Sequence, residues 1–389
     1  EDRLARDMRP PMPTTGWSLL LLAAPTISIH RAGPLFPARS LHVQLTSTQQ
    51  ASISKSHCVP PICPPVTRTQ SANTAQRAVR HTAPRMRIDQ DVERWLTDNV
   101  GAVSLSRPLG GSGWASFKRY EVEGADRSFF VKTSSRPCDI MFLGEALGLR
   151  AMHASKSVRI PEVLHYGDGD SGGSFIVMEF LQLSGRADAK LFGRKMAMMH
   201  LATPLAEEAQ QGKFGFDVPN TIGGTAQPNA WSDDWVAFFR EQRIGHQVRL
   251  ASDSRISKAW KLALQTTDDL HKLFDGISVK PSVLHGDLWS GNIASTGGEP
   301  TIFDPATYYG HHEAEWGMSW CASLGPSFWE GYRELIPKDP GFADRAVLYE
   351  LYHKLNHYNM FGGGYYTDSL GLLGQLARLG DKKLEDVAL

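Results

Sequence analysis

The sequence predicts an α+β protein of two lobes: a small N-terminal lobe with an antiparallel β-sheet and one main helix, and a larger, mostly helical C-terminal lobe. Three observations support this prediction. The chain has 389 residues, which is long enough for two lobes around a large core. Short apolar runs and glycine-rich turns fill residues 107–181. After Phe180, apolar residues recur at helical spacing together with several tryptophans.

The N-terminal lobe is expected over residues 86–180. Its first helix fits residues 89–99, where Asp89 can cap the helix and apolar side chains follow at helical spacing. The further elements expected in this lobe are two strands flanking a glycine-rich turn within 107–124, a strand at 127–134, a helix at 138–154, and strands at 160–167 and 173–181. A connector at about 179–184 leads into the C-terminal lobe, residues 181–389, which opens with a helix over 186–202.

Residues 1–85 are expected to be a disordered leader outside the fold. They are rich in Ser, Thr, Pro and Arg, and residues 8–88 hold nine Lys or Arg and no Asp or Glu. This is the composition of an organelle transit peptide, which predicts a chloroplast or other organelle as destination. Two alternatives stay open: a secretory signal built on residues 17–24, or an upstream extension of a cytoplasmic protein that starts at Met86.

Composition excludes several classes of protein. From Asp89 onward the chain has 30 basic and 38 acidic residues, a formal charge of −8, so no nucleic-acid partner is expected. The apolar run at 19–24 is too short to span a bilayer, so no membrane partner is expected. The spacing of the four cysteines fits neither a zinc site nor a disulfide framework.

Three residue types in the N-terminal lobe suit the binding of a nucleoside triphosphate. Gly110, Gly111 and Gly113 form a turn between strands, where backbone N–H groups can approach phosphates closely. Lys132 can neutralise phosphate charge. Glu145, in the following helix, can pair with this lysine, although each residue alone is more often a surface charge.

The C-terminal lobe contributes the stretch "LHGDLWSGNI" at residues 284–293. Asp287 can accept a hydrogen bond from an attacking hydroxyl as catalytic base, and His285 is expected to hold the loop. Asn292 and Asp304 flank an expected hairpin that turns at two glycines, which places both at its open end. Two such oxygen ligands, with phosphate oxygens and waters, suit Mg²⁺.

The order of these pieces along the chain is that of the protein-kinase-like fold. No G-x-x-x-x-G-K-[ST] segment is present, so a P-loop enzyme is not supported. Gly286 stands where protein kinases have the Arg of H-R-D, and no A-P-E segment follows, so a protein kinase is not supported either. A catalytically silent pseudokinase is disfavoured because every catalytic residue type is present.

The segments "VLHGDLWSGNI" and "DPATYYGHHEAEWGMSWC" resemble the fructosamine-3-kinase (ketosamine-3-kinase) family, within the aminoglycoside/choline-kinase-like branch of this fold. The resemblance covers residues 89–389, and Trp289 inside the loop makes it specific. It implies that ATP, with Mg²⁺, phosphorylates the 3-hydroxyl of ketosamines (ribulosamine, erythrulosamine or fructosamine adducts on lysine amines), free or protein-bound. The phosphate then eliminates and frees the amine, a deglycation repair. A small-molecule kinase of the aminoglycoside or choline type is the alternative.

The resemblance also implies roles for individual residues. Asp287 is the base and Asn292 and Asp304 bind the metal. The nucleotide is contacted by Lys132 with its partner Glu145, by the turn Gly110, Gly111, Ser112 and Gly113, and by the connector residues Met178, Glu179 and Phe180. Ser112 lies near the place where plant-type members often have a cysteine, so a disulfide switch through this turn is not expected.

The acceptor pocket is less readable from the sequence. A sugar linked to an amine is suited by aromatic faces and by a carboxylate, and the candidates are Trp289, His311, Glu313 and His357. Core packing is the expected role of Trp231, Trp235 and Trp316, and no zinc site is expected at the histidine pair that starts with His311. A monomer or weak homodimer is expected.

Overall fold

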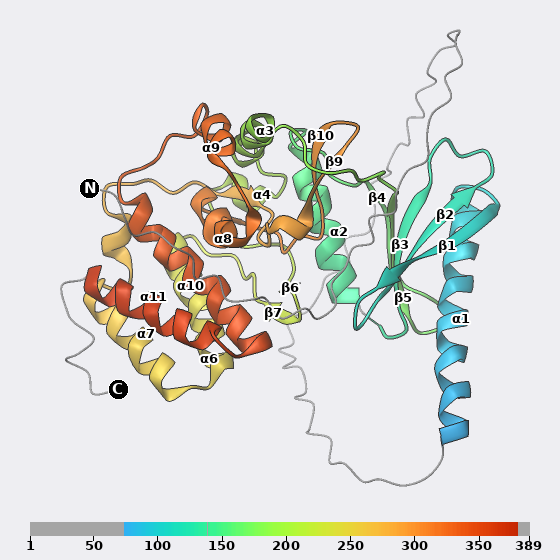
Figure 1. Cartoon of the computed structure of the whole chain (residues 1–389), viewed down its shortest axis with the longest axis horizontal. Coiled ribbons are helices and arrows are strands. Elements are labelled where there is room, and N and C mark those ends of the chain that lie inside the picture. Colours follow the sequence, from blue (N-terminus) through green and yellow to red (C-terminus); the bar gives the residue numbers. More distant parts are fainter. Residues whose placement is uncertain (1–73, 138, 380–389) are drawn as a thin grey trace, which may run out of the picture. The chain divides into compact units, whose positions relative to one another are not determined.

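The computed structural model describes residues 74–137 and 139–379 (Figure 1). Chain contacts group Arg80–Leu389 into one unit, which contains both predicted lobes. Residues 1–73 of the predicted leader, and Cys138, lie outside the described residues. The remaining leader residues, 74–85, form the start of helix α1, Thr74–Asn99.

The N-terminal lobe is a five-stranded antiparallel sheet in the order β1-β2-β3-β5-β4. Its strands are β1 Val103–Gly111, β2 Ser116–Val122, β3 Phe129–Ser134, β4 Val163–Asp168 and β5 Ser174–Glu179. The predicted strands and the predicted helix at 138–154 (α2, Asp139–Ala154) are therefore confirmed. Alternate side chains of β5 point to opposite faces, as the two-residue period of a strand requires: Phe175 and Val177 meet α1, and Ile176 and Met178 meet the main core.

Helix α1 packs one face of the sheet through Ile88, Val92 and Leu96 (Figure 1). The prediction that this helix begins at residue 89 is wrong, because the helix begins at Thr74 and continues through Pro84. Asp89 therefore does not cap the helix. It lies inside it, where its carboxylate accepts a hydrogen bond from Lys118 Nζ of β2 at 2.7 Å.

Helix α2 lies between the sheet and the C-terminal lobe (Figure 1). Phe142, Leu149 and Met152 are fully buried on it. Two glycines bring the helix close to the second lobe. A Cβ atom at Gly144 would lie 2.6 Å from Asn220 Cβ, and one at Gly148 would lie 2.8 Å from Thr307 Oγ1. A larger side chain at Gly144 would push α2 away from Asn220, and one at Gly148 would push it away from the segment that follows Asp304.

The C-terminal lobe contains helices around three two-stranded sheets, β6/β7, β8/β11 and β9/β10. The strands are β6 Asn220–Ile222, β7 Thr225–Gln227, β8 Ser282–Leu284, β9 Ile293–Thr296, β10 Glu299–Ile302 and β11 Tyr308–Gly310. The helices are α3 Ala189–Leu201, α4 Glu207–Gln210, α5 Trp235–Phe238, the π-helix η1 Phe239–Ile244, α6 Gly245–Ala251, α7 Ser254–Thr266, α8 Ser319–Ala322, α9 Pro326–Arg333, α10 Phe342–Phe361 and α11 Tyr365–Leu379, with 3₁₀ turns η2 His271–Phe274, η3 Ser290–Asn292 and η4 His312–Met318.

One hydrophobic core runs through this lobe and continues into α2 and the inner face of the sheet. Trp235 and Trp316 are buried in it and Trp231 packs against it, which confirms their predicted role in packing. The lobe also contains the predicted hairpin as β9/β10. The predicted α+β class, with a small antiparallel sheet and a mostly helical second lobe, is confirmed.

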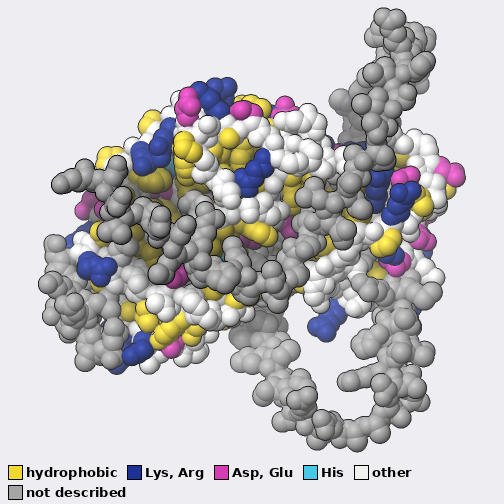
Figure 2. All heavy atoms as spheres, viewed as in Figure 1, with side chains coloured by type: hydrophobic (Ala, Val, Ile, Leu, Met, Phe, Trp, Pro, Cys, Tyr) yellow, Lys and Arg dark blue, Asp and Glu magenta, His cyan; other side chains and the backbone are white. Residues whose placement is uncertain are grey.

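The described surface mixes charged and apolar side chains. On the face in Figure 2, Lys and Arg are scattered among acidic and apolar groups and do not form a continuous stripe. Within residues 74–137 and 139–379, no helix combines the length and apolar character that crossing a membrane requires.

Candidate active site

Lys132 forms ion pairs with a carboxylate from each lobe. Its ammonium lies 2.7 Å from Glu145 Oε1 of α2 and pairs with Asp304 Oδ1 of the C-terminal lobe. Burial opposes the positive charge, but Asp304 and Glu145 outweigh it and raise the pKa of Lys132. Lys132 in turn holds the pKa of the half-exposed Asp304 low despite desolvation. The three predicted residues thus form one charged group at the junction of the lobes.

The glycine-rich turn closes on itself between β1 and β2. Ser112 N–H donates to Ala115 O at 2.8 Å, and Ala115 N–H donates to Ser112 Oγ at 3.2 Å. Gly111 must be small, because a Cβ there would lie 2.6 Å from Ala115 O. Gly110 and Gly113 face open space, so a phosphate can approach their backbone. Ser112 serves here as the residue that shapes the turn.

The catalytic loop follows β8 and is held by His285, as predicted. His285 Nε2 donates to Phe303 O at 2.9 Å, which leaves Nδ1 to accept the N–H of Asp287 at 3.2 Å. Burial lowers the pKa of His285, which favours this neutral tautomer. Gly286 has φ +79°, and a Cβ there would overlap the carbonyl of Ala306. Only glycine fits this position, which explains the absence of an arginine in the loop.

Glu315 of η4 holds the backbone of this loop by hydrogen bonds. The sequence did not predict this role. Its Oε2 accepts the N–H of His285 at 2.7 Å and its Oε1 accepts the N–H of Gly286 at 3.0 Å. His200 Nε2 lies 3.3 Å from the same carboxylate. Burial opposes ionisation, but His200 and His285 lower the pKa of Glu315. A carboxylate within the quoted segment "HHEAEWG" was the available signal, but its partners lie about 30 residues away in the chain.

Asn292 and Asp304 lie at the open end of the β9/β10 hairpin, as expected. The amide nitrogen of Asn292 donates to Asp287 O at 2.9 Å and to Asp304 O at 3.2 Å. Both donations orient the side chain and leave its Oδ1 for another partner. Asp304 adopts φ +62°, a conformation uncommon for a non-glycine residue. This set of an amide oxygen and a carboxylate fits Mg²⁺, which prefers oxygen ligands.

The surroundings of Asp287, the predicted catalytic base, shift the pKa of its carboxyl. Burial, followed by the negative charges of Asp304 and Glu315, raises its pKa to about 7. A base with this pKa matches neutral pH, where proton transfer from a hydroxyl is most effective.

The backbone of the predicted nucleotide-binding connector, Met178 to Phe180, is partly engaged within the fold. Met178 lies in β5, between two paired strands. The backbone N–H groups of Glu179 and Phe180 already donate to carbonyls at 3.0 and 2.9 Å. Met178, Glu179 and Phe180 therefore border the connector with the N–H groups of Glu179 and Phe180 already hydrogen-bonded.

The four predicted acceptor residues differ in their exposure to solvent. Trp289 and His357 are partly exposed, and the Trp289 ring lies over Gly291. His311 is 2% exposed and hydrogen-bonded to Tyr349 at 2.7 Å, and Glu313 is 3% exposed. Because both are closed to solvent, His311 and Glu313 have a packing role in this structure, not one in substrate contact.

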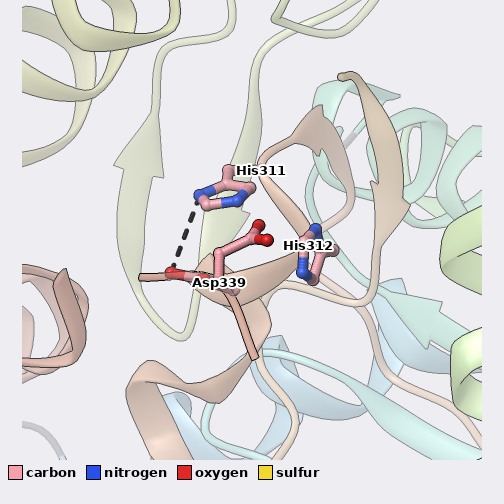
Figure 3. A group of neighbouring side chains, drawn as sticks. His311, His312 and Asp339 are labelled. Atoms are coloured by element: carbon pink, nitrogen blue, oxygen red, sulfur yellow. Dashed lines mark ion pairs between the residues drawn. The ribbon is translucent and has the colours of Figure 1, made fainter. Parts of the chain in front are cut away.

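His311, His312, Glu313 and Asp339 form a group whose potential ligand atoms lie within 4.8 Å of one another. Figure 3 shows His311, His312 and Asp339 side by side. Arg345 forms a buried bidentate ion pair with Glu313, at 2.7 and 2.8 Å. Within this group, the Glu313 carboxylate therefore already has a cationic partner.

The two lobes, the Lys132 ion pairs and the loop around Asp287 define a phosphotransferase of the protein-kinase-like fold. The sequence profile of the fructosamine kinase family matches residues 90–378. The chain belongs to this family.

Three relatives illustrate the similarity. The chain is 43% identical over 299 residues to the chloroplastic protein-ribulosamine 3-kinase of Oryza sativa subsp. japonica, covering 75% of this chain and 84% of the relative. It is 34% identical over 314 residues to the ketosamine-3-kinase of Mus musculus, covering 74% of this chain and all of the relative. A crystal structure from Thermobifida fusca YX-ER1, described as a candidate fructosamine-3-kinase, is 28% identical, with a TM-score of 0.64 over 74% of this chain and 98% of that one.

Proposed function

We propose that this enzyme uses ATP to phosphorylate the 3-hydroxyl of ketosamines, the ribulosamine, erythrulosamine or fructosamine adducts of lysine amines, and so starts their removal. The observation that carries the proposal is the placement of Asp287 beside Asn292, Asp304 and the Lys132–Glu145 pair. The family and the names of its relatives support the ketosamine as acceptor.

In the proposed reaction Asp287 accepts the proton of the 3-hydroxyl as its oxygen attacks the γ-phosphorus of ATP. A new P–O bond forms, and the bond to the β-phosphate oxygen breaks to release ADP. Lys132, held by Glu145, neutralises charge on the remaining phosphates. Mg²⁺ held by Asn292 and Asp304 would add positive charge at the transferring phosphate.

The 3-phosphate product then eliminates phosphate, as the family resemblance implies, and water hydrolyses the remaining carbon–nitrogen linkage, which frees the lysine amine and releases the sugar as a dicarbonyl compound. The reaction therefore repairs glycated amines.

An acceptor panel tests this proposal. The enzyme is incubated with Mg²⁺-ATP and with ribulosamine, erythrulosamine and fructosamine derivatives of lysine, and with choline and kanamycin, and ADP release is measured. Ketosamine-dependent ADP release is expected. Turnover of choline or kanamycin alone would move the enzyme to the alternative small-molecule kinases.

The Asp287→Ala variant separates an enzyme from a pseudokinase. Its turnover should fall at least about 1,000-fold, while ATP affinity stays near wild type, because the base acts on the acceptor. Wild-type ATP binding with no turnover of any ketosamine would favour a catalytically silent protein.

The leader suggests that the chain is sent to a plastid. The relatives from Oryza sativa are described as chloroplastic, which supports this destination. A fluorescent fusion with residues 1–85 intact should enter the organelle, whereas a fusion without them should remain cytosolic. A full-length fusion that stays in the cytosol would reverse this assignment.

A further inference from the structure

One face of helix α10 carries charged and aromatic side chains, each three or four residues after the one before: Glu350, Lys354, His357 and Phe361. Residues at this spacing lie on the same side of a helix. Trp320 of α8 and the start of α11 face them. We use the term aromatic box for Trp320, His357, Phe361 and Tyr365.

The rings of the box contact one another. His357 stacks on Tyr365 at a centroid distance of 4.9 Å and on Phe361 at 5.6 Å, and Trp320 meets His357 edge-on at 5.6 Å. Trp320 is 40% exposed and Phe361 is 59% exposed. Large aromatic rings grouped at an open surface are unusual unless they meet a ligand or a partner.

The chain's own Lys354 occupies this box. Its Nζ lies 3.8 Å from the centroid of the Trp320 ring and 5.7 Å from that of Tyr365. Two carboxylates complete its surroundings, Asp368 at 3.0 Å and Glu350 at 3.8 Å. An aromatic face with nearby carboxylates is the chemistry that recognises an alkylammonium ion. Lys354 therefore marks a position where a cationic amine is stable, and the two carboxylates exceed its single charge.

The box lies beside the catalytic loop. Helix α8 packs against η3, which carries Asn292. Cys321, next to Trp320, lies within the electrostatic reach of both Asp287 and Lys354. In a ketosamine only the first carbons of the sugar separate the amine from the 3-hydroxyl. An acceptor that presents this hydroxyl to Asp287 therefore places its amine close to the loop, against which α8 and its Trp320 pack.

We propose that the aromatic box is the acceptor subsite for the amine-bearing arm of the ketosamine, and that Lys354 competes with this amine for the box. The inference rests on the proposed function and adds the group that recognises the acceptor. It predicts opposite effects for the two partners: removing the aromatic face weakens acceptor binding, and removing the competing cation strengthens it.

The test measures KM for a ribulosamine of Nα-acetyl-lysine. Trp320→Ala should raise this KM about fivefold or more, the size of one lost cation–π contact. Lys354→Met keeps the aliphatic stem but removes the charge, and should lower the same KM about threefold or more. The carboxylates that it leaves are partly exposed, at 37% and 48% of their side chains, and so stay hydrated. The KM for ATP should not change in either variant.

Lys338→Met is the matched control. Lys338 also lies over an aromatic ring, that of Phe342 at 4.9 Å, but outside the box, so its removal should leave both KM values at wild type. An unchanged acceptor KM in Trp320→Ala, or a raised one in Lys354→Met, would overturn the proposal.

Calorimetric titration of the same ketosamine without ATP separates the two proposals. If the ligand binds wild type but not Trp320→Ala, yet is not phosphorylated, the box stands and the proposed function fails. If it is phosphorylated and binds both proteins equally, the proposed function stands and the box fails.

Discussion

Glu315 illustrates how a buried side chain can determine the geometry of a loop that it does not belong to. Its two oxygens accept the backbone N–H groups of His285 and Gly286, the residues directly before Asp287. Hydrogen bonds to a charged acceptor are worth about 1.5–3 kcal/mol, and a buried unpaired donor costs about as much. The position of the base therefore depends on this carboxylate.

Glu315→Gln should lower kcat about 10–100-fold and lower the melting temperature, because an amide cannot accept both N–H groups. The KM for ATP should remain within about twofold, since the nucleotide contacts lie elsewhere. Steady-state kinetics and thermal unfolding measure both effects. Glu330→Gln, an exposed carboxylate in a surface ion pair, is the control and should change neither. A wild-type kcat in Glu315→Gln would show that the loop holds its shape without this support.

The pKa of about 7 at Asp287 predicts a pH-dependent rate. Because the base must be ionised to accept a proton, kcat/KM should rise as pH increases through about 7 and then level off. A profile from pH 5 to 9 measures this. An inflection near pH 4 would show that the carboxyl keeps an ordinary pKa.

The same shift predicts an effect on stability with a defined sign. A carboxyl whose pKa is raised by folding binds its proton more tightly in the folded state, so its ionisation destabilises the fold as pH rises from about 4 through 7. Asp287→Asn should therefore raise the melting temperature relative to wild type at pH 8 and not at pH 4, while it abolishes turnover. Equal differences at both pH values would contradict this.

At the scale of elements, helix α2 of the N-terminal lobe packs directly against the C-terminal lobe, and this contact determines how closely Glu145 approaches Asp304. Gly148 lies against Thr307 and Pro305, directly after Asp304, and Glu145 is one turn away on the same helix. The absence of a side chain at Gly148 thus allows α2, which carries Glu145, to approach the segment that follows Asp304.

Gly148→Leu should push α2 outward, raise the KM for ATP and lower kcat at least about tenfold. Gly371→Leu is the matched control, because it lies in helix α11 with nothing within 4 Å of an added Cβ, and it should stay active. The comparison of both kinetic constants checks the prediction. Equal activity of the two variants would show that α2 can move without loss.

Element prediction succeeded where the local pattern was strong. The strands of the N-terminal lobe and α2 follow from apolar runs bounded by glycine turns. The predicted start of α1 at residue 89 was wrong, because the basic stretch before it has the composition of a leader and yet is helical. Strands β6, β7, β8 and β11 have three residues each, too few to show a two-residue period. The order of the motifs along the chain predicted four of the site residues: Lys132, Asp287, Asn292 and Asp304. The sequence did not predict Glu315 or the aromatic box, because their roles depend on contacts made only after folding.

At the scale of the whole molecule, helix α1 defines where the folded body begins. Ile88, Val92 and Leu96 are each at most 1% exposed and cover the outer face of the sheet. Burial of each such side chain contributes roughly 1.5–3 kcal/mol.

A protein that starts at Met86 should therefore keep its melting temperature and activity, whereas one that starts at Gly101 should be insoluble or unfolded. Circular dichroism and the kinase assay distinguish the two. A stable, active protein that starts at Gly101 would show that the sheet does not need this cover.

The close approach at Gly144 and Gly148 also bears on how the activity is controlled in a cell. Many signalling enzymes of this architecture are turned on and off by swinging the corresponding helix. Here that helix rests directly on the opposite lobe, and Gly286 leaves the loop no arginine through which a phosphorylated segment could act on it. An off state reached by swinging this helix would first have to open the contacts at Gly144 and Gly148.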